Sequence, residues 1–132
     1  PEHTLLISWQ LPYMVSDPTP ERGDIVTFWS DELGKVLVKR VIGLPGETIT
    51  FVGGHVYVNG ERLDESEYLD DSVVTEPGEQ DEFVVPDGCI FVLGDNREVS
   101  YDARYWENPY ISQDKIQSDV EVVIPFHKLP WF

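Results

Sequence analysis

The chain has 132 residues, enough for one domain with its own hydrophobic core, and 41% of them are hydrophobic. This composition is typical of a globular protein and excludes a disordered chain. The formal net charge of −16 argues against nucleic acid as a partner, because phosphate binding requires clusters of Lys and Arg.

The first half of the chain predicts short strands separated by turns. Residues 4–9 (TLLISW) form an apolar segment, and a proline-rich stretch follows. Residues 24–29 (DIVTFW) and 35–44 (KVLVKRVIGL) are predicted strands, because β-branched and aromatic residues recur between turn residues. The tripeptide RGD at 22–24 is interpreted as the start of a strand and not as an adhesion motif.

Turn residues divide the next two predicted strand regions. Within residues 47–63, the dipeptide Gly53-Gly54 is a strong signal for a two-residue hairpin, and Asn59-Gly60 predicts a further turn. Residues 81–96 (DEFVVPDGCIFVLGDN) predict another pair of strands, separated by the turn at residues 86–88.

The end of the chain completes an all-β pattern. A last strand is predicted over residues 120–126, and the one helical candidate is a turn near residues 112–116 with Ser112 as its cap. No βαβ unit is present, so we predict mainly antiparallel sheets with at most one or two short helical turns. Residues 1–132 are interpreted as a single domain.

Two features predict structure more than chemistry. The acidic segment, residues 64–82, is predicted to be a solvated loop, because it lacks the ligand spacing, the Gly and the Glu of a calcium-binding loop. Cys89, the only cysteine, excludes an internal disulfide and is predicted to be a small core residue within an apolar run. We expect no cofactor and no bound metal.

The lysine of the second predicted strand is the first candidate for chemistry. Side chains alternate along a strand, so Lys39 shares a face with Leu37 and Val41. Both faces are mostly apolar, which predicts burial of the ammonium. Desolvation lowers the pKa of a lysine and allows it to act as a general base near neutral pH. The alternative is an edge lysine that reaches water or pairs with a carboxylate.

The polar loop, residues 94–104 (GDNREVSYDAR), is the second candidate region. It follows a predicted strand, and loops held by a sheet often carry functional groups. Taken alone, it is equally the pattern of a polar turn whose Asp and Arg side chains pair to fix its shape.

Together these stretches carry a family resemblance. The segments RGDIVTF (22–28), VKRVIGLPGE (38–47) and GDNREVSYDAR (94–104), in this order and separation, resemble those of type I signal peptidases. These are bacterial membrane-bound enzymes that remove signal peptides. VYVNGERLDE (56–65) and the ending IPFHKLPWF (124–132) are similar to small family members of the Gram-positive type. The resemblance covers essentially the whole chain and implies a Ser–Lys dyad with Lys39 as the general base.

The resemblance also bears on the position of the nucleophile. The family serine lies in a Ser-Met-x-Pro-Thr-Leu box that precedes an apolar strand, and residues 4–9 resemble that strand. The nucleophile is therefore expected upstream of Pro1, together with the membrane anchor. Ser16 follows the strand, lacks the adjacent Met and is interpreted as a loop residue. The chain by itself is expected to fold but not to cleave.

The polar loop receives its roles from the same resemblance. Ser100 matches the family position that hydrogen-bonds the lysine, and a hydroxyl can do so without adding a charge that raises the lysine pKa. Asp102 and Arg104 match a pair that braces the loop. The family box usually reads Ser-x-Asp-Ser-Arg, and Ala103 replaces its second Ser with little expected effect. Three further residues are expected to extend this support: Asp95, Arg97 and Arg40.

The resemblance implies that the substrates are signal peptides of exported preproteins, cut after Ala-x-Ala. An extended peptide can pair with residues 36–39 and place alternate side chains in small pockets. The residues matched to these pockets are Leu5, Thr27, Val36, Leu37 and Val38, with Thr27 in place of the usual Val. The implied location is the bacterial cell membrane, with a transmembrane segment that precedes this chain and the catalytic domain on the extracytoplasmic side.

Two alternatives remain. The first is a signal peptidase-like protein without activity that acts as a binding or assembly factor, which the retention of Lys39 and Ser100 disfavours. The second is another Ser–Lys protease, such as a self-cleaving repressor. It is disfavoured by the acidic charge and the absence of a basic helix.

Overall fold

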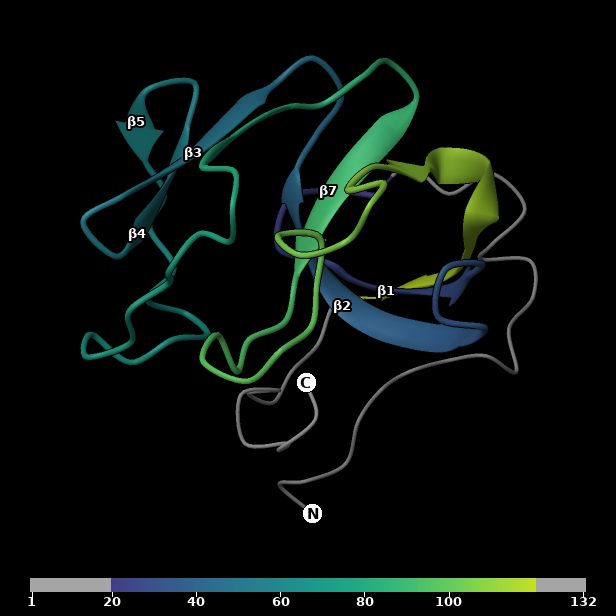
Figure 1. Cartoon of the computed structure of the whole chain (residues 1–132), viewed down its shortest axis with the longest axis horizontal. Coiled ribbons are helices and arrows are strands. Elements are labelled where there is room, and N and C mark those ends of the chain that lie inside the picture. The colour runs from purple at the N-terminus through teal and green to yellow at the C-terminus, as the bar shows by residue number, and fades with distance from the viewer. Residues whose placement is uncertain (1–19, 121–132) are drawn as a thin grey trace.

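The computed structural model describes residues 20–120, whose strands form two antiparallel sheets (Figure 1). The strands are β1 (Ile25–Ser30), β2 (Lys35–Gly43), β3 (Thr48–Val52), β4 (His55–Val58), β5 (Glu61–Arg62), β6 (Glu82–Val84), β7 (Cys89–Leu93), β8 (Ile111–Ser112) and β9 (Ile116–Val120). A five-stranded sheet has the order β8-β7-β2-β1-β9, and a four-stranded sheet has the order β5-β4-β3-β6. The prediction of an all-β, mainly antiparallel fold is confirmed.

The predicted turns of the smaller sheet are present. Gly53 and Gly54 have φ angles of 59° and 85° and join β3 to β4, with Val52 opposite His55 in the register. Asn59 and Gly60, with φ angles of 51° and 85°, join β4 to β5. Two successive positive φ angles match the twist of a hairpin, which is why Gly and Asn occupy these positions.

The two strands predicted within residues 81–96 are present, but they do not pair with each other. β6 pairs with β3, whereas β7 pairs with β2 and β8, so the turn between them carries the chain from one sheet to the other. The burial of the two strands explains the difference. Only Phe83 of β6 is buried, whereas β7 is buried along most of its length as an inner strand of the larger sheet.

The predicted helical turn is present as a single 3-10 turn, η2 (Gln113–Lys115), the one helical element within residues 20–120. Ser112 precedes it, but its side chain makes no capping hydrogen bond, so that part of the prediction is wrong. In the described part of the chain, no helix has the length and apolarity needed to cross a bilayer. The predicted strand at 4–9, Ser16, and residues 121–126 of the last predicted strand lie outside the described residues.

Three aromatic rings of the core pack together where the two sheets meet. Phe83 and Phe91, from β6 and β7, have ring centroids 4.7 Å apart, and Phe51 of β3 contacts both rings. Gly43 ends β2 at this junction, where a Cβ atom would lie 2.9 Å from Cγ1 of Ile49 and 3.0 Å from Cβ of Phe91. Cys89 was predicted to be a core residue. Its side chain packs against this core but is only half-buried.

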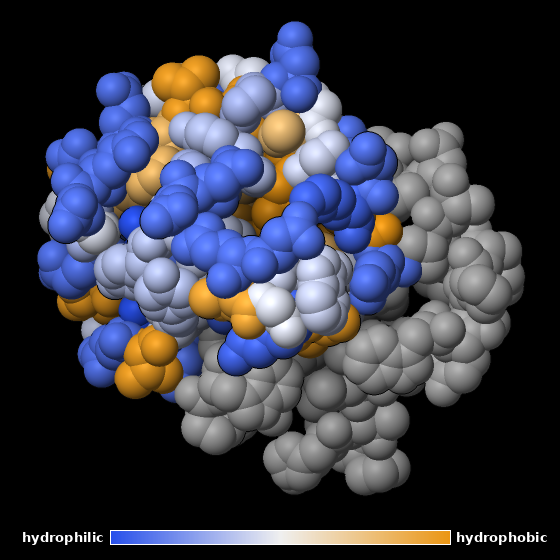
Figure 2. All heavy atoms as spheres, turned by 45° about the vertical axis from the view of Figure 1, so that its right-hand side comes forward, coloured by the Kyte–Doolittle hydropathy of each residue, from blue (hydrophilic) through white to orange (hydrophobic). Residues whose placement is uncertain are grey.

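The surface agrees with the charge of the chain. Figure 2 shows a face that is mostly hydrophilic, with separate apolar patches between the polar side chains. The exposed large apolar side chains include Val36, Val99 and Tyr101, which lie near one another in the region described next.

Candidate active site

The structure brings Lys39 and Ser100 together, although 61 positions separate them in the sequence. Lys39 lies on β2 opposite Val26 of β1, and the polar loop that follows β7 carries Ser100. Both residues are buried, with 5% and 4% of their surface exposed. The Lys39 Nζ donates a hydrogen bond to the Ser100 Oγ over 2.9 Å.

The surroundings of Lys39 disfavour its charged form. Burial lowers the pKa of Lys39 below its ordinary value, because the ammonium loses its hydration. The negative charge of Asp102 raises this pKa, while Arg104 and Lys35 lower it further. Burial has the largest effect, so the Lys39 amine gives up its proton more readily than an exposed lysine does.

The polar loop is held by hydrogen bonds between its own residues. The backbone N–H of Ser100 donates to the carbonyl of Asn96 over 2.8 Å, forming a turn inside the loop. The Asp102 Oδ2 accepts a hydrogen bond from the N–H of Gly94, which ties the second half of the loop to the end of β7. Ala103 is fully buried, and its methyl group belongs to the core cluster. A serine there would place a hydroxyl in an apolar environment.

Three buried arginines brace this loop: Arg97 and Arg104 belong to it, Arg40 lies on β2, and each pairs with a carboxylate. Arg40 donates two hydrogen bonds to Asp95, of 2.8 and 2.7 Å, and Arg104 donates two to Asp102, both of 2.8 Å. Arg97 is paired with Glu65 over 2.6 Å. Such two-pronged contacts fix orientation as well as charge. All five supporting residues predicted from the sequence take part in these pairs, and their supporting role stays a prediction.

Glu65 belongs to the acidic segment, so the prediction of a solvated loop is wrong for part of it. Thr75 is buried and its Oγ1 accepts a hydrogen bond from Arg97, while the ring of Tyr68 lies 4.0 Å from the guanidinium of Arg40. The segment runs beside the polar loop at the lower left of Figure 1. Buried guanidinium groups require partners, and local composition does not reveal which acidic side chains supply them.

The predicted substrate-binding residues lie in different places. β1 pairs with β2 from Lys35 to Arg40, but β7 pairs with β2 only from Arg40 onward. The second edge of residues 35–39 therefore has no strand partner within residues 20–120. A groove of about 470 Å³ follows this edge and includes Val36, Leu37 and Val38.

Of the other two predicted residues, only Thr27 is described, and it is not part of that groove. Thr27 is 2% exposed on β1, opposite Val38 in the register, and is not among the residues that line the groove. Leu5 lies outside the described residues.

Four residues that line the groove were not predicted from the sequence: Leu33, Lys35, Val99 and Tyr101. Val99 and Tyr101 are 63% and 49% exposed and line the groove across from β2. The ring of Tyr101 stacks on that of Tyr105, with centroids 5.9 Å apart and planes at 14°. The sequence offered one signal for Val99 and Tyr101, since they are the two direct neighbours of Ser100.

Metal ligation finds no support in this part of the molecule. Within the described range, no three side chains of His, Cys, Asp or Glu gather closely enough to hold an ion.

Comparison with known proteins places the chain in a family. A family model described as signal peptidase, peptidase S26, matches residues 2–125. A probable signal peptidase I-2 from Synechocystis sp. is 42% identical over 107 residues, covering 76% of this chain and 46% of the relative. Signal peptidase I P of Bacillus subtilis subsp. natto is 35% identical over 116 residues, covering 83% of this chain and 62% of the relative.

A solved structure agrees with these matches. The crystal structure of a signal peptidase I from Enterococcus faecalis V583 has a TM-score of 0.63 and 31% identity, covering 80% of this chain and 100% of that chain. The chain spans about half the length of the first curated relatives that it matches. With a family model over nearly its whole length and relatives above 30% identity, the chain belongs to the signal peptidase family, peptidase S26.

Proposed function

We propose that this chain is the part of a signal peptidase I that supplies the general base, Lys39, for cleavage of signal peptides from exported preproteins. The observation that carries the proposal is the buried Lys39–Ser100 hydrogen bond in a chain of this family. The lowered pKa of Lys39 adds to it, because a base must be neutral to accept a proton.

The proposed reaction needs a serine that precedes Pro1. Its oxygen attacks the scissile carbonyl while neutral Lys39 takes the hydroxyl proton. The C–N bond then breaks, an ester forms between the serine and the signal peptide, and Lys39 gives the proton to the leaving amine. Water hydrolyses the ester in the second half of the reaction, again with Lys39 as the base. Ser100 keeps the amine in place throughout.

The substrate is proposed to bind as an extended strand along the edge of β2 that borders the groove and has no strand partner within residues 20–120. Main-chain groups of residues 36–39 would hydrogen-bond the peptide next to the base, and alternate side chains would face Val36, Val38 and the neighbouring walls of the groove. Small pockets at two alternate positions account for Ala-x-Ala selectivity, because larger side chains would clash. By its family, the protein is proposed to sit at the bacterial membrane with this domain on the extracytoplasmic side.

The first prediction tests the role of Lys39. In the full-length protein, Lys39→Ala is expected to lower cleavage of a peptide with an Ala-x-Ala site by roughly 10²- to 10⁴-fold, the usual contribution of general base catalysis. Circular dichroism checks that the variant is folded. Lys115→Ala is the matched control, because Lys115 is exposed and its salt-bridge partner is Asp31, which is not a residue of the candidate site. Its activity is expected to equal that of the wild type.

Two results would contradict the proposal. Equal cleavage by Lys39→Ala and the wild type would remove Lys39 from the reaction. A wild-type protein that binds the peptide without cleaving it, under conditions where a relative cleaves, would favour a binding or assembly factor instead.

A further inference from the structure

The three buried arginines of this region differ in which part of the chain supplies their carboxylate partners. Arg40 and Arg104 pair with Asp95 and Asp102, which belong to the polar loop itself. Arg97 instead pairs with Glu65, which lies about thirty positions earlier in the acidic segment. The polar loop therefore takes one of its counter-charges from a separate part of the chain.

The contact between Arg97 and Glu65 is buried and two-pronged. The side chain of Arg97 is 0% exposed and that of Glu65 is 10% exposed. Nη2 and Nη1 of Arg97 lie 2.6 and 3.1 Å from the two carboxylate oxygens. Burial disfavours the charge of Arg97, but the groups around it, Glu65 before Tyr68 and Asp95, together hold the pKa of the guanidinium above its ordinary value. Without Glu65, a buried positive charge would lack its compensating partner.

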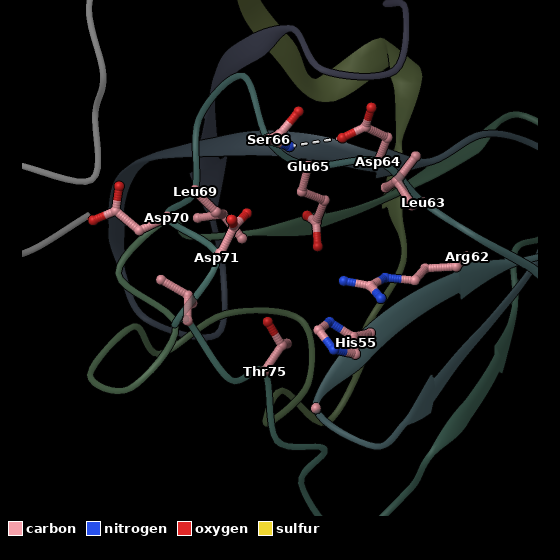
Figure 3. A pocket seen from close by; sticks show the side chains of 12 residues that line it. His55, Arg62, Leu63, Asp64, Glu65, Ser66, Leu69, Asp70, Asp71 and Thr75 are labelled. Carbon is pink, nitrogen blue, oxygen red and sulfur yellow. Dashed lines mark hydrogen bonds between the residues drawn. The ribbon is translucent and has the colours of Figure 1, made fainter.

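Glu65 stands apart from its acidic neighbours. In the pocket of Figure 3 its side chain points inward, whereas Asp64 and Asp70 point away from the pocket. Thr75 lies across the same pocket and accepts a second hydrogen bond from Arg97. Glu67, two positions along, is exposed. The segment thus turns one carboxylate toward the loop while its other acidic residues stay in solvent.

Tyr68 connects this pair to a second arginine. Its hydroxyl donates a hydrogen bond of 3.0 Å to Glu65, and its ring lies 4.0 Å from the guanidinium carbon of Arg40. Burial, followed by the charge of Glu65, raises the pKa of Tyr68, so the phenol keeps the proton that it donates. A cation over an aromatic face is attracted to it, most strongly where water is excluded. Glu65 and Tyr68 therefore hold Arg97 and Arg40 together.

Arg97 in turn is built into the turn that presents Ser100. Its Nε donates to the carbonyl of Gly94 over 2.8 Å, and its own carbonyl accepts a hydrogen bond of 3.0 Å from Arg104. Ser100 follows three positions later, and its N–H bonds to Asn96, the residue before Arg97. A displacement of Arg97 would therefore be passed to Ser100 through the backbone.

We propose that Glu65 and Tyr68 are positioning residues of the site, which hold the polar loop so that Ser100 stays in contact with Lys39. The inference rests on the proposed function for its link to catalysis, but the contacts themselves do not. The acidic segment is then part of the scaffold of the active site, through two side chains among many solvated ones.

The test compares Glu65→Gln with Glu67→Gln in the full-length protein. Glu65→Gln keeps the size of the side chain but removes the charge, so Arg97 loses its counter-ion. We expect kcat to fall roughly 10- to 100-fold with KM nearly unchanged, as for a misplacement of the reacting groups. Glu67→Gln removes the same charge from a solvated position and is expected to leave both constants unchanged. Tyr68→Phe keeps the ring beneath Arg40, loses the hydroxyl, and is expected to show a smaller fall.

A second measurement separates positioning from simple destabilisation. In NMR titrations of the Lys39 side chain, Glu65→Gln is expected to shift the Lys39 pKa upward, because a loosened loop admits water to the amine. Combined with Ser100→Ala, it should cause little further loss of kcat, since its effect passes through Ser100. If Glu65→Gln does not fold, Tyr68→Phe carries the same comparisons.

The outcomes distinguish the inference from the proposed function. A lower melting temperature with unchanged kcat and unchanged Lys39 titration would overturn the positioning role and leave the peptidase proposal intact. The positioning role would also be overturned if Glu65→Gln lowered kcat as much in the Ser100→Ala background as it does in the wild type. If the wild type does not cleave, but Glu65→Gln alone still shifts the Lys39 titration, the positioning role stands and the peptidase proposal fails.

Discussion

At the scale of single residues, Lys39 is a buried amine whose burial lowers the stability of the folded state. Within residues 20–120 its hydrogen-bond partner is the Ser100 hydroxyl, at 2.9 Å, whereas the buried arginines nearby each have a paired carboxylate. A buried ammonium without a directly paired carboxylate is destabilised. Its pKa is therefore lowered, and it loses its proton at a lower pH than an exposed lysine does. The same burial that weakens the fold therefore prepares the proposed base.

This cost predicts a pH-dependent gain from Lys39→Met. The unfolded chain keeps its Lys39 proton up to about the ordinary pKa of 10.5, whereas the folded chain releases it at lower pH. Between these two values the unfolded state binds more protons, so the stability of the wild type rises with pH in that window. Lys39→Met is expected to be more stable below it, by about 1.4 kcal/mol for each unit of the lowered pKa.

Urea unfolding at several pH values measures this difference. The advantage of Lys39→Met should be largest below the folded pKa of Lys39 and should shrink as the pH approaches that of an ordinary lysine. Lys115→Met is the control, because Asp31 raises the pKa of the exposed Lys115 and its removal should bring no gain. An advantage of Lys39→Met that does not change with pH would show that packing, and not charge, is its cause.

At the scale of elements, β2 combines two environments in one strand. Within residues 20–120, its first half pairs with β1 alone and borders the groove on its other edge, whereas from Arg40 onward it pairs with β7. Lys39 lies where the two halves meet, so it is buried yet close to an edge that a peptide could reach. The transition follows from the length of β7, which pairs with β2 from Arg40 onward and then continues into the polar loop.

The junction of the sheets predicts a sensitive position at Gly43. A Cβ atom there would lie 2.9 Å from Cγ1 of Ile49 and 3.0 Å from Cβ of Phe91, and the latter atom cannot rotate away. Gly43→Ala is therefore expected to destabilise the fold by about 1–3 kcal/mol through overpacking. Val52→Ala, at a position that is 56% exposed, is the control with a small expected effect. Chemical unfolding of both variants provides the comparison, and a Gly43→Ala protein as stable as the wild type would contradict the close contact.

Elements with a local signal could be predicted, and contacts between distant segments could not. Gly53-Gly54 predicts its hairpin because positive φ angles are a property of the residues themselves. The partner of β6 depends on which strand lies nearby in space, and alternation within β6 contains no such information. The contact of Lys39 with Ser100 was expected from the family resemblance alone. Glu65 was missed because its role is set by Arg97 and not by its own acidic surroundings.

At the scale of the whole molecule, charge is distributed unequally between inside and outside. The buried arginines are balanced by three carboxylates, so the net charge of −16 comes from the remaining residues of the chain. Exposed charges of one sign repel one another through solvent, whereas buried pairs are screened little by salt. Composition alone predicts the acidity, but only the structure shows that each of the three buried arginines is matched by a carboxylate.

This distribution predicts that salt stabilises the protein. Raising the ionic strength from about 0.01 M to about 1 M shortens the Debye length from roughly 30 Å to roughly 3 Å, which removes most of the repulsion between surface carboxylates. The melting temperature in NaCl is therefore expected to rise. A variant with Glu67→Gln, Asp71→Asn and Asp87→Asn, all exposed positions, should melt higher at low salt and respond less to added salt. A melting temperature that falls with salt would mean that favourable surface pairs, such as Lys115 with Asp31, outweigh the repulsion.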